Sequence, residues 1–312
     1  MLSFLNPALL PRSAKMVIAF GTLYVVWGST YLAIKIGLNA ALPPTAFAAM
    51  RLVPAGLLLL GIARLRGASL RMRPADLRLT VLVGILLLVG GMYSMFLAER
   101  SVDSGLAALI VALLPLWIAL AETLVPGMER PSGRGIAGLL IGFAGLGILL
   151  APRLLGVAGA PGEILWIAVI IVGGWSWAAG SIISKKRPVR ADAMVATGYE
   201  MLAAGLVLTA IATVLGEWRL VRFTPAGAGA LAYLIVIGSA VAFTAFVWLL
   251  RNAPASKVMT YAYVNPLVAT FLGWMVLGER LDAWALAGMV VIVTGVALTT
   301  SAPVRAPRTS VR

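Results

Sequence analysis

Long apolar stretches separated by short polar gaps dominate the pattern of this chain. A helix that crosses a membrane needs roughly 20 mostly apolar residues. Ten stretches of about that length follow one another, at roughly 16–36, 44–63, 77–97, 104–125, 134–151, 163–184, 193–215, 227–250, 255–277 and 283–300. Proline, glycine or charge punctuates nearly every gap, as in Lys185-Lys186-Arg187-Pro188. The pattern predicts an all-α integral membrane protein with ten transmembrane helices.

The basic residues predict how these helices are oriented. If the N-terminus is cytoplasmic, the cytoplasmic tails and gaps hold 18 of the 25 Lys and Arg residues, and the opposite side holds five. Cytoplasmic segments of membrane proteins carry such an excess. The apolar core of the first span is longer than that of a signal peptide, so we expect this helix to be retained. We therefore expect a multi-pass protein of a bacterial inner (cell) membrane with both termini in the cytoplasm.

The two halves of the chain resemble each other at an offset of about 150 residues. We therefore expect one five-helix repeat at 1–152, a second at 153–302, and a cytoplasmic tail at 303–312. An odd number of spans per repeat makes the second repeat enter the membrane from the opposite side. Inverted repeats are typical of secondary transporters, which bind substrate near the midplane and alternate access. Each of the following positions in the first half matches one in the second: Trp27 matches Trp177, Lys35 matches Lys185, Arg51–Gly56 matches Glu200–Gly205, Pro115 matches Pro266, Glu129-Arg130 matches Glu279-Arg280, Gly138 matches Gly288, and Gly145 matches Gly295.

Composition narrows the function classes. Hydrophobic residues form 61% of the 312 residues and charged residues 12%, whereas soluble domains average about 45–50% and about 25%. The net charge of +14 is explained by topology, so we expect no nucleic-acid partner. Cysteine and histidine are absent from the sequence, and we expect no metal and no cofactor. A Gly-x-Ser-x-Gly elbow, a P-loop and paired intramembrane aspartates are also absent, so a membrane enzyme is the less favoured hypothesis.

Several motifs resemble a known family. Trp27-Gly-Ser-Thr-Tyr-Leu-Ala-Ile-Lys-Ile-Gly37, Glu200-Met-Leu-Ala-Ala-Gly205, Tyr261-Ala-Tyr-Val-Asn-Pro266 and Leu277-Gly-Glu-Arg-Leu281 carry the resemblance. They are similar to the EamA branch of the drug/metabolite transporter superfamily, and in particular to its YedA-like and YddG-type exporters. The resemblance covers about residues 16–300. It implies ten helices in two EamA repeats and export of amino acids or other small metabolites.

Polar and aromatic side chains within apolar spans are the candidate substrate-binding residues, because lipid-facing helices have little use for them. Each also has a structural alternative, such as helix packing, an interfacial aromatic belt or a kink. Helical spacing puts Trp27, Thr30 and Tyr31 near one face, and Trp177 with Ser181 on another. Together with these residues, the family resemblance implies a site between the first, third, fourth, sixth, eighth and ninth helices. The candidates are Trp27, Thr30, Tyr31, Tyr93, Phe96, Trp175, Trp177, Ser181, Phe243, Phe246, Tyr261, Tyr263 and Asn265.

Charged residues and prolines within spans form a second group of candidates. We expect Lys35, Arg51, Glu122 and Glu200 to act in gating or structural pairing rather than to contact the substrate. Pro115 and Pro266 should kink their helices, since proline lacks the amide hydrogen. With no histidine and no carboxylate at the centre of a predicted span, a proton relay is hard to assemble. We therefore expect facilitated rather than proton-coupled transport.

The sequence favours a secondary transporter that exports amino acids, possibly aromatic ones, or related small metabolites. The alternative is a broad-specificity exporter of drugs or toxic organic cations, which an aromatic cage binds by cation–π attraction. A deep acidic residue facing the cavity would favour that alternative. The expected partners are a small-molecule substrate and membrane lipid, and the chain is expected to be a monomer or homodimer.

Overall fold

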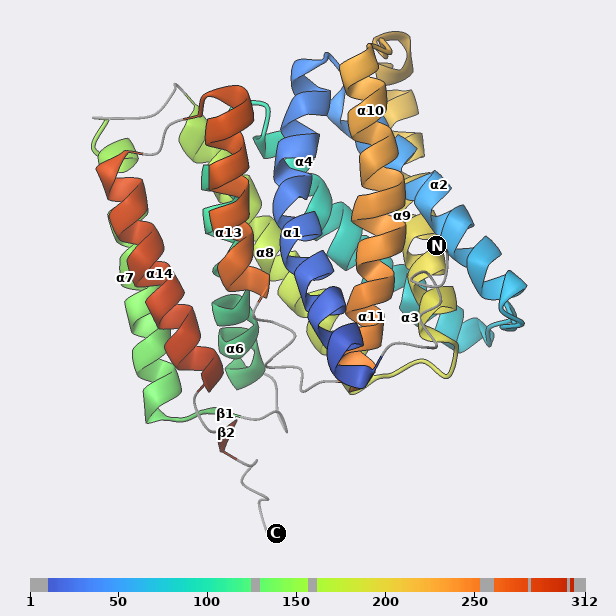
Figure 1. Ribbon diagram of the computed structural model, residues 1–312, viewed down its shortest axis with the longest axis horizontal. Coiled ribbons are helices and arrows are strands. Elements are labelled where there is room, and N and C mark those ends of the chain that lie inside the picture. The colour runs from blue at the N-terminus through green and yellow to red at the C-terminus, as the bar shows by residue number, and fades with distance from the viewer. Residues whose placement is uncertain are drawn as a thin grey trace.

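The computed structural model describes residues 11–124, 130–156, 162–252, 261–279, 282–301 and 304–305, and within them it confirms the ten predicted spans (Figure 1). Six spans are single helices, namely α1 (Arg12–Asn39), α2 (Pro44–Leu65), α7 (Gly133–Leu154), α8 (Glu163–Lys186), α9 (Ala193–Val214) and α14 (Ala283–Ser301). Among the described residues, six helices are long and apolar enough to cross a membrane. This second set of six includes Pro74–Ala98 and leaves out α14, which is one of four further apolar helices with 10–17 residues. The chain is therefore a multi-pass membrane protein.

The other four spans are interrupted helices. They are α3 (Pro74–Gly84), η2 (Ile85–Met92) and α4 (Tyr93–Ala98); α5 (Ser104–Val111) and α6 (Leu114–Leu124); α10 (Pro225–Tyr233), η4 (Leu234–Val241) and α11 (Ala242–Asn252); and α13 (Tyr261–Leu272) and η5 (Gly273–Leu277). A 3₁₀ turn, η3 (Glu217–Arg219), precedes α10. The one departure from all-α structure among the described residues is a two-residue antiparallel pair, β1 (Arg130–Pro131) with β2 (Val304–Arg305).

The interruptions occur at related places in the two repeats. The π-helices η2 and η4 both lie in the third span of their repeat, and such segments are frequent at functional sites. In the fourth span the helix stops at Val111 and restarts at Leu114, directly before Pro115. Proline cannot donate to the preceding turn, so this break has a local cause. Pro266 lies inside α13, which continues to Leu272.

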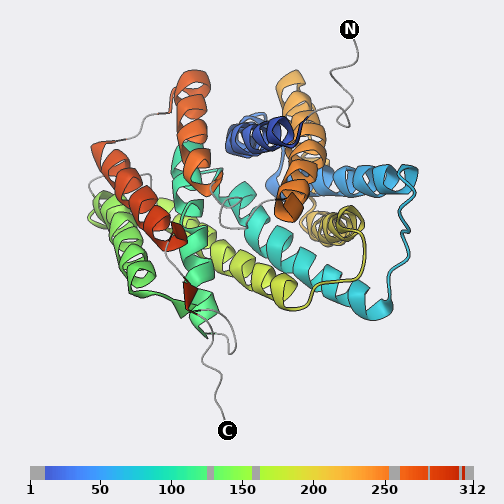
Figure 2. The same cartoon turned by 60° about the horizontal axis from the view of Figure 1, so that its bottom comes forward.

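The first helix of each repeat packs on the third and fourth spans of the other repeat. In the first repeat α1 packs on α13 and on the α10–η4–α11 span of the second. In the second repeat α8 packs in the same way on α5, α6 and the α3–η2–α4 span of the first. The remaining pairs are α2 with α9 and α7 with α14, the latter side by side at one edge of the bundle (Figure 2). This is the contact pattern that an inverted repeat predicts.

Glycines set the distance between α7 and α14. A Cβ atom on Gly138 would lie 2.7 Å from the main-chain oxygen of Gly295, and one on Gly145 would lie 2.7 Å from the amide nitrogen of Ile292. Such distances are shorter than real Cβ contacts, so the two backbones meet through bare glycine faces. The Gly138, Gly142 and Gly145 stripe therefore makes a contact within the chain.

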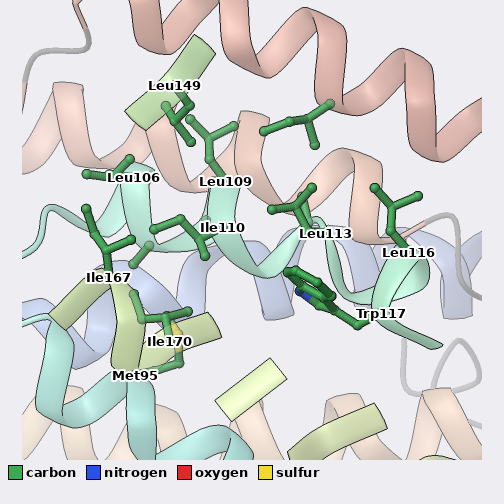
Figure 3. Packing of buried hydrophobic residues seen from close by; sticks show 14 of the residues in the cluster. Met95, Leu106, Leu109, Ile110, Leu113, Leu116, Trp117, Leu149, Ile167 and Ile170 are labelled. Atoms are coloured by element: carbon green, nitrogen blue, oxygen red, sulfur yellow. The ribbon is translucent and has the colours of Figure 1, made fainter. Parts of the chain in front are cut away.

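The largest buried apolar cluster surrounds α5 and α6. Figure 3 shows Leu109 of α5, Trp117 of α6 and Leu113 in the break between them, together with Ile170 of α8 and Leu149 of α7. Ile110, Trp117 and Ile170 also face the interior space between the repeats. The core of the fold is thus one wall of that space.

A candidate site between the two repeats

A cavity lies where the two repeats meet. Its volume is about 130 Å³, measured over the positions that the centre of a water molecule can occupy. That is room for several waters or a small metabolite. The lining comes from all six expected spans and also from α2, which contributes Arg51. Of the candidate residues, those in the lining are Trp27, Thr30, Tyr31, Arg51, Trp177, Phe243, Tyr261 and Asn265.

Aromatic rings form two sides of the cavity. On one side the Trp27 ring lies 4.8 Å from that of Tyr261 and 5.3 Å from that of Phe243, both near edge-to-face. On the other side are the indoles of Trp117 and Trp177. Rings at these distances attract each other through their quadrupoles, so they hold a fixed aromatic surface. Such walls suit a flat apolar or aromatic group.

Asn265 supplies an unused acceptor to the cavity. Its side chain is 5% exposed, and its Oδ1 atom has no hydrogen-bond partner among the described residues. A buried amide oxygen without a donor costs on the order of 1–3 kcal/mol. A bound molecule with an N–H or O–H group would supply that donor. Asn265 is therefore the side chain most clearly prepared for a ligand.

Arg51 gives the cavity its charge. The side chain is 5% exposed, and its Nε donates to Ser239 Oγ at 3.3 Å. The guanidinium carbon lies 5.9 Å from the centre of the Phe96 ring. Among the described lining residues Arg51 is the one with a formal charge. The structure places Arg51 in the cavity wall, and its expected role in gating or structural pairing stays a prediction.

Five other candidates lie outside the described lining, and their contacts show why. The Tyr93 hydroxyl is 2.6 Å from Thr45 Oγ1, and Phe96 is fully buried against Phe47, with ring centres 5.2 Å apart. The Trp175 ring packs on that of Trp117 in a tilted arrangement, with ring centroids 5.2 Å apart. Each of these side chains supports the wall or another part of the fold.

The last two of the five support α8 and α1. Ser181 Oγ donates to the main-chain oxygen of Trp177 one turn earlier, at 2.8 Å. Phe246 packs on Trp27 with ring centres 5.1 Å apart. The side chains of Tyr263 and Glu122 lie outside the part of the chain that the structure describes.

The remaining span charges lie away from the cavity. Lys35 Nζ donates to the main-chain oxygens of Glu99 at 2.7 Å and Val102 at 2.9 Å, which fixes the turn between α4 and α5. Glu200 lies where α9 crosses Gly84 of α3, and it is outside the described lining. These two bonds fit the structural role expected of Lys35, which stays a prediction.

Glu99 is the main residue that the sequence did not point to. It is 0% exposed, and neither carboxylate oxygen has a hydrogen-bond partner among the described residues. It lies two residues beyond the predicted span 77–97, so it counted as a loop residue. Lys35 was the sequence signal that could have pointed to this turn, because a lysine deep in a span requires nearby oxygen atoms.

Carboxylates of the second repeat cap helices of the first at one end of the bundle. Glu279 accepts from Ser104 N at 3.0 Å and Ser104 Oγ at 2.8 Å, at the start of α5. Glu217 accepts from Thr45 Oγ1 and Ala46 N, both at 2.8 Å, at the start of α2. Free amide hydrogens and the helix dipole favour anions at such positions. We call this the Glu99 end, and these contacts join the two repeats there.

The ten spans, their inverted pairing and the internal cavity define an integral membrane transporter built from two five-helix repeats. The chain belongs to the EamA-like transporter family of the drug/metabolite transporter superfamily, whose model matches residues 14–151 and again 164–301.

Relatives of known name agree with this class. The chain is 37% identical to the uncharacterized inner membrane transporter YedA of Escherichia coli (strain K12), over 90% of this chain and 89% of that one. It is 26% identical to the WAT1-related protein At3g02690, chloroplastic, of Arabidopsis thaliana, over 88% of this chain and 67% of that one. A crystal structure at 23% identity, covering 93% of this chain and 97% of that one, superposes with a TM-score of 0.67 and shows the same fold.

Proposed function

We propose that the protein exports amino acids, aromatic ones included, or related small metabolites across a bacterial inner membrane by alternating access. The observation that carries this proposal is that one aromatic-walled cavity is lined both by Arg51 and by Asn265, whose side-chain oxygen has no hydrogen-bond partner among the described residues. A guanidinium matches a carboxylate through paired hydrogen bonds. An amide oxygen accepts from an ammonium group, and the rings take an apolar side chain.

The alternative, an exporter of organic cations, has less support. It calls for an acidic side chain facing the cavity, and the charge among the described lining residues is the positive one of Arg51. A bound cation near a buried guanidinium would be repelled in surroundings of low polarity. The aromatic walls alone do not distinguish the two functions.

We propose that efflux is driven by the substrate gradient and, for a charged substrate, by voltage. Glu99 and Glu200 lie outside the described lining, and that lining contains no carboxylate to carry protons through the cavity. The test imposes an inward proton gradient at zero voltage with equal zwitterionic substrate on both sides of proteoliposomes. Net accumulation of substrate would contradict gradient-driven efflux.

Counterflow in proteoliposomes across amino acids and organic cations tests the substrate class. We expect exchange of amino acids, and we expect Asn265→Leu to lower it by roughly tenfold or more, as the loss of a hydrogen bond to a charged group implies. Ser181→Ala is the control, since Ser181 bonds to its own helix outside the described lining. Exchange of organic cations alone would favour the alternative function.

The orientation can be tested on its own, because the chain contains no cysteine. Arg190 and Leu220 lie in exposed turns at opposite ends of α9. With both termini in the cytoplasm, an impermeant thiol reagent added outside cells should label Leu220→Cys and leave Arg190→Cys unlabelled until the membrane is opened. The reverse pattern would invert the proposed topology.

A further inference from the structure

We propose that Glu99 is a proton-binding switch, which holds a proton while the Glu99 end is closed and releases it when that end opens. The proton is the ligand of this site, and the site is separate from the cavity, because Glu99 is outside its described lining. The proposal concerns the opening of one end of the molecule and stands whatever small molecule is carried.

The first argument is the burial of Glu99 without a donor. Its side chain is 0% exposed, and both carboxylate oxygens lack hydrogen-bond partners among the described residues. An ionised carboxylate in that position loses its hydration and gains no hydrogen bond in return. A protonated carboxyl group avoids most of this cost, so the closed end favours the neutral form.

The second argument comes from the charged groups around Glu99. Lys35 of α1, Arg51 of α2 and Glu279 after η5 act on it electrostatically, and the Tyr31 hydroxyl of α1 is within reach of its charge. Arg100 and Asp103 lie in the same turn, and Glu163 begins α8, which packs on α4.

These neighbours leave the carboxylate without a direct partner. The Lys35 ammonium donates to the main-chain oxygens of Glu99 and Val102, and Arg51 Nε donates to Ser239. With two cationic side chains this close, a bound metal cation is disfavoured and a proton is the fitting ligand. Burial raises the pKa of the Glu99 carboxyl, in the turn between two spans, well above its usual range, and Lys35 only partly opposes this.

The third argument is where Glu99 lies in the fold. The turn between α4 and α5 that carries it is bonded to Lys35 of α1 and, through Ser104, to Glu279 of the second repeat. Opening this end must separate some of these contacts and let water reach the turn. A hydrated Glu99 returns toward the usual pKa of 4.5 and loses its proton at neutral pH.

The sign of the pH effect follows from this difference. The closed form binds one more proton than the open form at any pH between the usual value and the raised one. Within that pH window, each unit of increasing external pH raises the ratio of open to closed form by at most about tenfold. At pH values below the window, the ratio no longer depends on pH. Acid outside therefore holds the Glu99 end closed. Since the proton returns to the side it came from, the switch does not couple efflux to a proton gradient.

Thiol labelling measures opening without any substrate. Ala108 is 1% exposed and lines the cavity in the second turn of α5. In Ala108→Cys, the rate of reaction with an impermeant methanethiosulfonate added outside cells reports access from the Glu99 end. Dividing by the rate for Leu220→Cys, which is in an exposed turn, removes the pH dependence of thiol chemistry and checks the orientation.

We expect the normalised rate to rise several-fold from external pH 5 to pH 8, by at most about tenfold per unit. In Glu99→Gln, which resembles the protonated form, it should stay low and flat; Glu99→Asp should keep a pH dependence. Glu200→Gln, a control at another buried carboxylate, should behave as the parent. A flat profile in the parent, or an equal slope in Glu99→Gln, would overturn the proposal. If Glu99→Gln does not fold, the pH profiles of the parent and of Glu99→Asp still test the proposal, because a flat profile in the parent contradicts it.

Discussion

Replacing Arg51 with methionine is expected to lower transport of carboxylate-bearing substrates by roughly 100-fold, the cost of removing one partner of a buried charged pair. We expect the protein to fold, because methionine fills a similar volume and adapts to irregular space, and the hydrogen bond given up is the 3.3 Å one to Ser239 Oγ. Arg51→Lys should be intermediate, since lysine keeps the charge and loses the paired geometry. Initial rates of counterflow, at matched amounts of folded protein, provide the measurement.

Two controls separate binding from structure in this experiment. The amide derivative of the same amino acid lacks the carboxylate, so Arg51→Met should affect its transport much less. Arg100 is an exposed arginine in the turn after α4, and Arg100→Met should leave transport unchanged. Equal losses for the acid and the amide would show that Arg51 acts on the fold and not on the substrate.

The second large effect is expected on stability, at the contact between α7 and α14. A Cβ atom on Gly138 would lie 2.7 Å from both the oxygen of Gly295 and the amide nitrogen of Thr299, and backbone atoms cannot move aside as a side chain does. Overpacking of this kind typically costs about 1–3 kcal/mol. We expect Gly138→Ala to lower the thermal unfolding temperature in detergent and the yield of folded protein.

Gly147 provides the matched control on the same helix. Among the described residues, no atom beyond the neighbouring residues and backbone of its own helix lies within 4 Å of the position that its Cβ would occupy. Gly147→Ala should therefore keep the stability of the parent or raise it slightly, since alanine favours helix more than glycine does. Similar melting temperatures for the two variants would mean that α7 and α14 do not meet as described.

The sequence predicts the spans well because each is a long apolar run with its own boundaries. The interruption before Pro115 also has a local cause in the missing amide hydrogen. The inverted pairing follows from an odd number of spans per repeat. These features depend on residues close together in the chain or on a regular offset, so neighbours in space need not be known.

The site was harder to predict, because it depends on which helix faces which. Trp175 and Trp177 are two residues apart, and only packing on Trp117 decides that the first supports the wall while the second lines it. Arg51 and Phe96 both lie in apolar spans, and the cavity takes only the arginine. Burial of Glu99 requires the contacts of α1 and the second repeat, which lie far away in the sequence.

One of the two carboxylate caps at the Glu99 end, that of Glu217, breaks the symmetry of the repeats. At the repeat offset, the position matching Glu217 is Gly67, which has no side chain to cap a helix at the other end. A carrier without substrate mainly populates the conformation in which it forms more hydrogen bonds. Maximal rate and half-saturation concentration should then both differ between efflux and influx. For an uncoupled carrier their ratio must be the same in the two directions, so the faster direction is also the one that saturates at the higher concentration.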